Sequence, residues 1–109
     1  MMPVPLPLAT EADRKAARLM AVWGQVPVYS SLDWIPVQNL VATQPEVSEH
    51  RVLELSGVHN PGPIDVALIG ERYIIVEGHH RATVAVQRGH SSILASIRSL
   101  TPAPPGGAT

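Results

Sequence analysis

Cysteine is absent from this sequence, and lysine occurs only once, at Lys15. Without cysteine the chain can form no disulfide framework, no thiolate nucleophile and no Cys-based zinc site. The other basic residues are all arginines, whose planar guanidinium suits phosphate or carboxylate recognition at a defined place better than diffuse attraction. The net charge is −1, which is less basic than a dedicated duplex-DNA binder normally is.

Long apolar runs are also missing. No run approaches the roughly 18 residues of a membrane span, and residues 1–7 lack the basic region and unbroken apolar stretch of a signal peptide. We therefore expect no membrane partner and a cytoplasmic location. The chain has 109 residues, of which 45% are hydrophobic. This is enough for one domain with a hydrophobic core.

The two ends of the chain differ in composition from its middle. Residues 1–9 are rich in proline and predict an extended arm, and residues 99–109 predict a flexible Pro/Gly tail. Residues 10–33 predict a helix and a connector, in which Thr10 caps a helix over 11–23 and Gly24 ends it. One helical face is apolar, with Ala12, Ala16, Leu19, Met20 and Trp23. The opposite face carries Arg14, Lys15 and Arg18, which could touch nucleic acid or simply be solvated.

Residues 34–98 predict the main domain. A short strand is expected at 34–37, where Pro36 restricts it to a sheet edge or a strand start. A helix follows from its cap Ser48 to about residue 55 or 56, where Gly57 closes it, and then a loop at 59–62. Two strands at 64–69 and 72–77 form a hairpin around Gly70 and Glu71. A helix is expected over 79–88, with Ala82, Ala85 and Val86 on one face, and Gly89 ends it. A last strand follows at 93–97. This order predicts a small α/β domain of the α+β kind.

The best candidate site is the Gly-His-His-Arg turn at 78–81, where a strand passes directly into a helix. The first N–H groups of a helix lack internal partners and attract anions, and Gly78 lets the backbone bend and a ligand approach. Arg81 can offer its planar fork to phosphate oxygens. His79 and His80 can donate hydrogen bonds or gain charge near an anion, and Thr83 could reach a ligand from the first helical turn. The alternative is a plain turn with surface histidines.

Glu77, the residue before this glycine, has three candidate roles. It could orient Arg81, hold a divalent metal beside a phosphate, or act as a general base. An acid beside an anion site repels the ligand unless a cation offsets it, which favours Mg²⁺ if the ligand is a nucleotide. The five histidines do not indicate structural zinc because none are spaced i, i+4, although a transition metal at His79 or His80 with Glu77 stays an option.

The run of residues 63–85, with its hairpin, its Glu-Gly-x-x-Arg turn and its following helix of small residues, resembles the core of the ParB-like nuclease/sulfiredoxin superfamily. The similarity extends over about 34–98, from the opening strand near Ile35 to the strand after Gly89. The resemblance implies a mixed sheet and a nucleotide or phosphate site at Gly78, His79, His80 and Arg81. Known members include CTP-dependent chromosome-partition proteins, ATP-using sulfiredoxins, a free-serine kinase and domains described as nucleases.

Departures from each branch limit what the resemblance implies. Partition proteins usually carry Gly-Glu-Arg-Arg at the turn and have a helix-turn-helix and a dimerisation domain, for which little chain follows Arg98. Sulfiredoxins need a cysteine where His79 stands, so their reaction is excluded. The free-serine kinase has further substrate-binding segments that find no counterpart here.

Three functional hypotheses remain. The first is a stand-alone domain that binds ATP or CTP with Mg²⁺, or another phosphate-bearing ligand, and that could act as a nucleotide hydrolase, phosphotransferase or nuclease through Glu77, His79 and His80. The second is a non-enzymatic phage- or plasmid-type regulator that binds protein or DNA. The third is a degenerate domain that retains anion binding only. The helix over 11–23 could pack on the sheet, or serve a homodimer or a partner protein.

Overall fold

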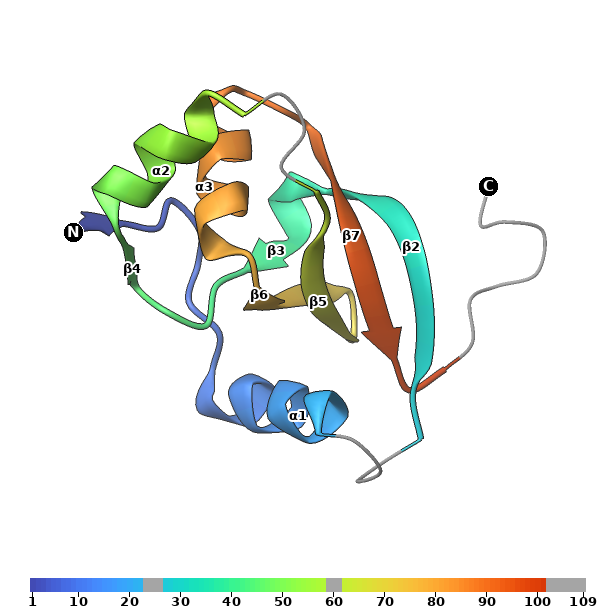
Figure 1. The fold of residues 1–109 in the computed structure, drawn as a ribbon. Helices are drawn as coiled ribbons and strands as arrows, with labels where there is room; N and C mark the ends of the chain where they lie inside the picture. The colour runs from blue at the N-terminus through green and yellow to red at the C-terminus, as the bar shows by residue number, and fades with distance from the viewer. Residues whose placement is uncertain (23–26, 59–61, 102–109) are drawn as a thin grey trace.

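The computed structural model describes residues 1–22, 27–58 and 62–101 (Figure 1). Three helices are present in this part of the chain: α1 (Glu11–Ala21), α2 (Glu49–Ser56) and α3 (His79–Gln87). The strands are β1 (Met2–Pro3), β2 (Tyr29–Pro36), β3 (Leu40–Val41), β4 (Glu46–Val47), β5 (Ile64–Ile69), β6 (Arg72–Glu77) and β7 (Ser92–Ser99), with a 3₁₀ turn at Val37–Asn39.

Five strands form one mixed sheet in the order β2-β7-β5-β6-β3. The β2–β7 and β5–β6 pairs are antiparallel, whereas β5 runs parallel to β7 and β3 parallel to β6. This is the mixed α+β architecture that the sequence predicts. The hairpin strands occupy the expected residues, and the last strand does lie beside the hairpin, inserted between β5 and the edge strand β2.

Helices cover both faces of the sheet (Figure 1). α3 packs on one face, with Ala82 and Ala85 against Ile64, Ile75 and other sheet residues. α1 packs on the other, where Ala17 and Met20 meet Ala67 and Ile74. Because side chains alternate along a strand, neighbours such as Ile74 and Ile75 enter opposite layers. α2 lies against α3, and Val52 of α2 and Val84 of α3 belong to a third apolar cluster.

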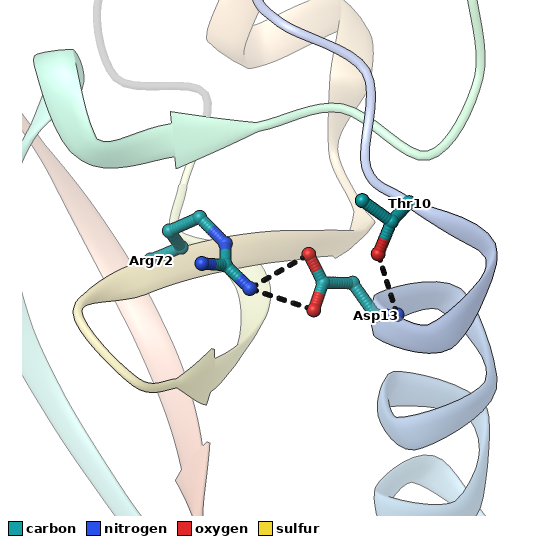
Figure 2. A network of polar contacts seen from close by, with 3 residues as sticks. All are labelled: Thr10, Asp13 and Arg72. Atoms are coloured by element: carbon teal, nitrogen blue, oxygen red, sulfur yellow. Dashed lines mark hydrogen bonds and ion pairs between the residues drawn. The ribbon is translucent and has the colours of Figure 1, made fainter.

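The inward face of α1 differs from the expected one. Thr10 caps the helix as predicted, its hydroxyl accepting the N–H of Asp13 at 3.1 Å. The buried residues, however, are Asp13, Ala17 and Met20, while Ala12 and Leu19 are exposed. Asp13 forms an ion pair across the layers, in which Arg72 Nη2 lies 2.7 and 2.9 Å from the two carboxylate oxygens of Asp13 (Figure 2). Trp23 and Gly24 lie outside the described residues.

Residues 1–9 are extended and lie against the body of the domain. β1 pairs with β4, Leu8 forms a parallel bridge to Ala42, and Val4 and Ala9 are buried. Backbone hydrogen bonds from Val4 N–H to Pro45 O and from Ala9 N–H to Ala42 O continue this contact. At the other end Ser99 belongs to β7, and the expected tail from 102 to 109 lies outside the described residues.

The expected strand at 34–37 is displaced. β2 begins at Tyr29 and ends at Pro36, because it pairs with β7 over eight consecutive residues, and Val37 opens the 3₁₀ turn. Pro36 does lie on an edge strand, as predicted. α2 has Ser48 and Gly57 as its caps, as expected, whereas residues 59–61 of the expected loop lie outside the described part. No helix in the described residues is long and apolar enough to cross a membrane.

Candidate functional site

Gly78 forms the junction between β6 and α3, and no other residue fits it without strain. Its φ is 110°, in the left-handed region that L side chains rarely adopt. A Cβ added to Gly78 would lie 2.6 Å from Cγ2 of Ile64, a side chain that is completely buried. The strand can therefore turn directly into the helix only because this position is glycine.

The N-terminus of α3 differs from those of α1 and α2. Thr10 and Ser48 cap α1 and α2 with their hydroxyls. Gly78 has no side chain, and none of the described residues supplies a side-chain cap to α3 in its place. The first helical bond runs from Ala82 N–H to Gly78 O. The N–H groups that precede Ala82 in this turn have no partners within the helix, so this end favours negative charge.

His79, the first residue of α3, points into the protein and is 5% exposed. Its Nε2 accepts the backbone N–H of Thr43 at 3.0 Å, while the Thr43 hydroxyl donates to Ile75 O at 2.8 Å. An accepting Nε2 requires the neutral ring with its proton on Nδ1. Burial, together with the neighbouring charge of His80, lowers the pKa of His79 from 6.5 to about 4. The ring is therefore neutral near pH 7. The sequence had suggested instead that His79 could become positively charged beside an anion.

His80 is half-buried and contacts a second backbone group. Its Nε2 accepts the N–H of Ser48, the cap of α2, at 3.3 Å. Together the two histidines therefore hold both ends of the segment 43–48, which leads from β3 into α2.

Arg81 lies on another side of α3. Successive helical residues are rotated by about 100°, so Arg81 projects roughly 200° away from His79. Its Nη1 donates to Pro63 O at 3.0 Å. The expected clamp of Arg81 and a histidine around one phosphate is thus not assembled, because these side chains contact three separate segments.

Thr83 is completely buried, and its hydroxyl donates to His79 O at 2.8 Å. In this conformation it cannot reach a ligand, and the hydroxyl instead satisfies a backbone carbonyl inside the helix. The sequence left open whether Thr83 reaches a ligand or lies on the helix surface; the structure places it in the interior.

Glu77 is exposed at the end of β6, opposite Asp65 in the sheet register. The ion pairs among the described residues are His50–Glu54 and Asp13–Arg72, so the expected pairing of Glu77 with Arg81 is not found there. Nor do three or more His, Asp or Glu side chains gather into a metal-binding group within the described part. The metal role of Glu77 stays a prediction without a preformed ligand set.

A pocket of about 380 Å³ lies between α1 and β6 and reaches Thr43, the residue that contacts His79 of the turn. We call it the turn pocket; its lining residues are Arg14, Ala17, Arg18, Ala21, Thr43, Ile75 and Val76. Thr43 links this pocket to α3, since it also contacts His79. None of the described residues that line it is acidic. The sequence had indicated the basic face of α1, but nothing in it placed Thr43 at the site.

Comparisons with known proteins show similarity at the level of structure. No family model and no curated protein matches the chain. The solved structure of sulfiredoxin from Arabidopsis thaliana is similar at a TM-score of 0.54 and 22% identity, covering 63% of this chain and 85% of that one. A C-terminally truncated chromosome-partitioning protein ParB from Caulobacter crescentus, complexed with CTP-gamma-S, is similar at 0.51 and 18% identity.

The ParB match covers 65% of this chain and 46% of the ParB chain, so this chain corresponds to less than half of that protein. At these identities the comparisons establish the fold. The chain has a ParB/sulfiredoxin-like fold, as the run of elements around the Gly-His-His-Arg turn predicted.

Proposed function

We propose that this ParB/sulfiredoxin-like domain binds a nucleotide or a related phosphate-bearing small molecule in the turn pocket. The observation that carries the proposal is that two arginines, Arg14 and Arg18, line this pocket together with Thr43, whose backbone N–H donates to His79 at the start of α3. In this arrangement the phosphates contact the two guanidiniums.

The charge of the pocket supports an anionic ligand. Neither Arg14 nor Arg18 belongs to an ion pair among the described residues. The lining contains two positive charges and no carboxylate. Such an uncompensated positive potential raises the local concentration of anions.

The size and the apolar part of the lining support a ligand larger than phosphate alone. Small-molecule sites usually occupy about 300–1,000 Å³, and the turn pocket, at about 380 Å³, falls within that range. Ala17, Ala21 and Val76 give it an apolar wall. Such a wall suits a base or ribose, while the arginines suit the phosphates.

The comparison with ParB supports a nucleotide as the ligand class. That protein was solved with CTP-gamma-S, which shows that a chain with this fold can hold a nucleotide. CTP and ATP are accordingly the first ligands to test.

Binding, rather than turnover, is the activity that the geometry favours. The Nε2 atoms of His79 and His80 already accept backbone N–H groups, so neither is free to take a proton without releasing its partner. The catalytic roles of Glu77, His79 and His80 stay predictions. Mg²⁺ usually binds through one or two carboxylates together with substrate phosphates. Any such ion would come with the nucleotide.

A non-enzymatic regulator is the second candidate, and one observation favours it. β2 is an open edge of the sheet, and its Leu32 and Trp34 are each 63% exposed. Exposed apolar side chains on an unpaired edge are typical of surfaces that contact other chains. Under this hypothesis partner binding would not depend on the turn pocket.

The test is a thermal-shift panel of ATP, ADP, CTP, GTP and inorganic phosphate, with and without Mg²⁺. A ligand that binds only the native state raises its stability, by about 2.7 kcal/mol at a hundredfold excess over Kd. We expect a nucleotide-dependent shift in the wild type that is lost in the Arg14→Ala/Arg18→Ala variant.

Lys15→Ala is the matched control, because Lys15 is exposed on the same helix and lies outside the pocket lining. It should keep the nucleotide-dependent shift. Absence of any shift with a folded protein, or an equal loss in Lys15→Ala, would contradict the proposal. Phosphate release from the nucleotide that shifts the melting temperature then distinguishes turnover from binding.

A further inference from the structure

α3 carries a second pair of basic side chains, Arg81 and Arg88, on a side of the helix that does not face the turn pocket. Residues seven apart on a helix point in nearly the same direction and are separated by about 10 Å along the axis. Both arginines line a pocket of about 130 Å³ between α3 and the start of β7. The segment just before β7 adds His90, and β7 itself adds Ser92.

Each guanidinium of this pair contacts a backbone carbonyl. Arg81 Nη1 donates to Pro63 O at 3.0 Å, and Arg88 Nη2 donates to Ser56 O. These contacts position the side chains, but a neutral carbonyl does not neutralise a charge. A guanidinium has five N–H donors, so each arginine keeps several for another acceptor.

The charge of the pocket is therefore uncompensated. Neither Arg81 nor Arg88 takes part in an ion pair among the described residues, and none of those lining the pocket is acidic. His90 and the Ser92 hydroxyl add further hydrogen-bond donors beside the two cations. Two arginines that line one pocket without a carboxylate suit the recognition of phosphate oxygens.

We propose that this pocket, lined by Arg81, Arg88, His90 and Ser92, is a second anion site that binds a single phosphate group. A water molecule occupies about 30 Å³ of liquid, so a pocket of about 130 Å³ accommodates a phosphate group. It is too small for a nucleoside, whose sites are several times larger. The phosphate comes either from a free phosphate compound or from a nucleic-acid backbone, and the probes below distinguish these sources.

The proposal does not rest on nucleotide binding in the turn pocket. The two sites share no lining residue. Arg81, which the sequence assigned to a phosphate at the turn, serves the second site in this arrangement. Failure of one proposal therefore leaves the other standing.

The experiment follows backbone amide NMR shifts of the full chain during titration with inorganic phosphate, at ionic strength held constant with chloride. We expect saturable shifts at His90 and Ser92. Because a hydrogen bond to a charged group contributes about 1.5 kcal/mol or more, Arg88→Gln should weaken this binding roughly tenfold. Arg51→Gln is the matched control, since Arg51 is exposed on α2 and lines neither pocket.

His90→Glu provides a second variant in case Arg88→Gln disturbs the contact with Ser56. It leaves that contact intact and adds a negative charge to the pocket, so it should abolish phosphate binding. A short oligo(dT) that produces the same shifts at lower concentration than inorganic phosphate would assign the site to a nucleic-acid backbone. Shifts with inorganic phosphate alone would assign it to a free phosphate compound.

Three results would overturn the proposal. Phosphate shifts confined to Thr43 and Val76 would place the anion in the turn pocket instead. No saturable shift at His90 or Ser92 would mean that the second pocket binds no phosphate. Equal weakening by Arg51→Gln and Arg88→Gln would show that general charge, rather than this pocket, attracts the ion.

Discussion

The ring of His79 accepts a hydrogen bond from the backbone N–H of Thr43, a residue 36 positions earlier in the chain, at 3.0 Å. This bond links the first turn of α3 to the segment that leads from β3 into α2. It also fixes the protonation state of the ring, because only a neutral imidazole can accept at Nε2. Protonation of His79 would turn that acceptor into a donor facing another donor.

The first prediction is a loss of stability in mild acid that depends on His79. The native pKa is lowered to about 4 from 6.5, so between these pH values the unfolded chain binds more protons than the native state. Stability therefore rises with pH across this window and falls as the pH drops from about 6.5 towards 4. The total loss is on the order of 3 kcal/mol, measured as the urea unfolding free energy at a series of pH values.

His79→Gln should flatten this dependence, since its amide oxygen can accept from Thr43 but does not titrate. His50→Gln serves as the control, because His50 is exposed and pairs only with Glu54. If wild type and His79→Gln lost stability in parallel between pH 6.5 and 4, another group would be responsible.

The second prediction concerns the glycine of the turn. Gly78→Ala places a Cβ at positive φ and 2.6 Å from Ile64 Cγ2, so backbone strain adds to overpacking. We expect a loss of about 2 to 5 kcal/mol of unfolding free energy, measured by urea denaturation.

Gly70→Ala separates the two causes of that loss. Gly70 also has a positive φ, 63°, but nothing lies within 4 Å of its added Cβ. It should lose only the strain energy, about 1 kcal/mol. Equal losses in both variants would show that the contact with Ile64 relaxes freely.

The third prediction concerns the ion pair that docks α1 on the sheet. The side chain of Asp13 is 10% exposed and that of Arg72 52% exposed. Because Arg72→Ala would leave a nearly buried carboxylate without its partner, we expect a loss of about 1 to 3 kcal/mol. A double-mutant cycle with Asp13→Ala should give a coupling energy of about 1 kcal/mol or more.

The exposed pair His50–Glu54 provides the comparison for that cycle. Its side chains are 83% and 55% exposed, and such i, i+4 pairs contribute only about 0.3–0.5 kcal/mol. A coupling between Asp13 and Arg72 no larger than this would indicate that apolar contacts alone hold α1 in place.

The sequence predicted the features whose causes are local. The hairpin follows from strand-like runs around Gly70, the ends of α2 from Ser48 and Gly57, and the β6–α3 turn from Gly78. Each of these signals lies within a few residues of the structure it determines. The ParB/sulfiredoxin-like fold could be inferred because these elements occur in a characteristic order.

What the sequence could not supply are contacts between distant residues. Asp13 and Arg72 are 59 positions apart, so the apolar pattern of α1 indicated a face that does not include the buried carboxylate. Thr43 carries no motif, although it lines the turn pocket. The divergence of His79 and Arg81 follows from helix geometry, but their partners, Thr43 and Pro63, depend on packing across the domain.

The position of β7 in the sheet has a consequence for how the chain reaches its native state. β7 separates β2 from β5, and no other strand of the described residues joins β2 to the hairpin. A nascent chain that has not yet produced residues 92–99 can form the hairpin but cannot attach the segment 29–36 to it. Closing contacts of such long sequence separation is slow, so we expect folding to wait for the last strand, with Ile35, the buried residue of β2, open to other chains until then.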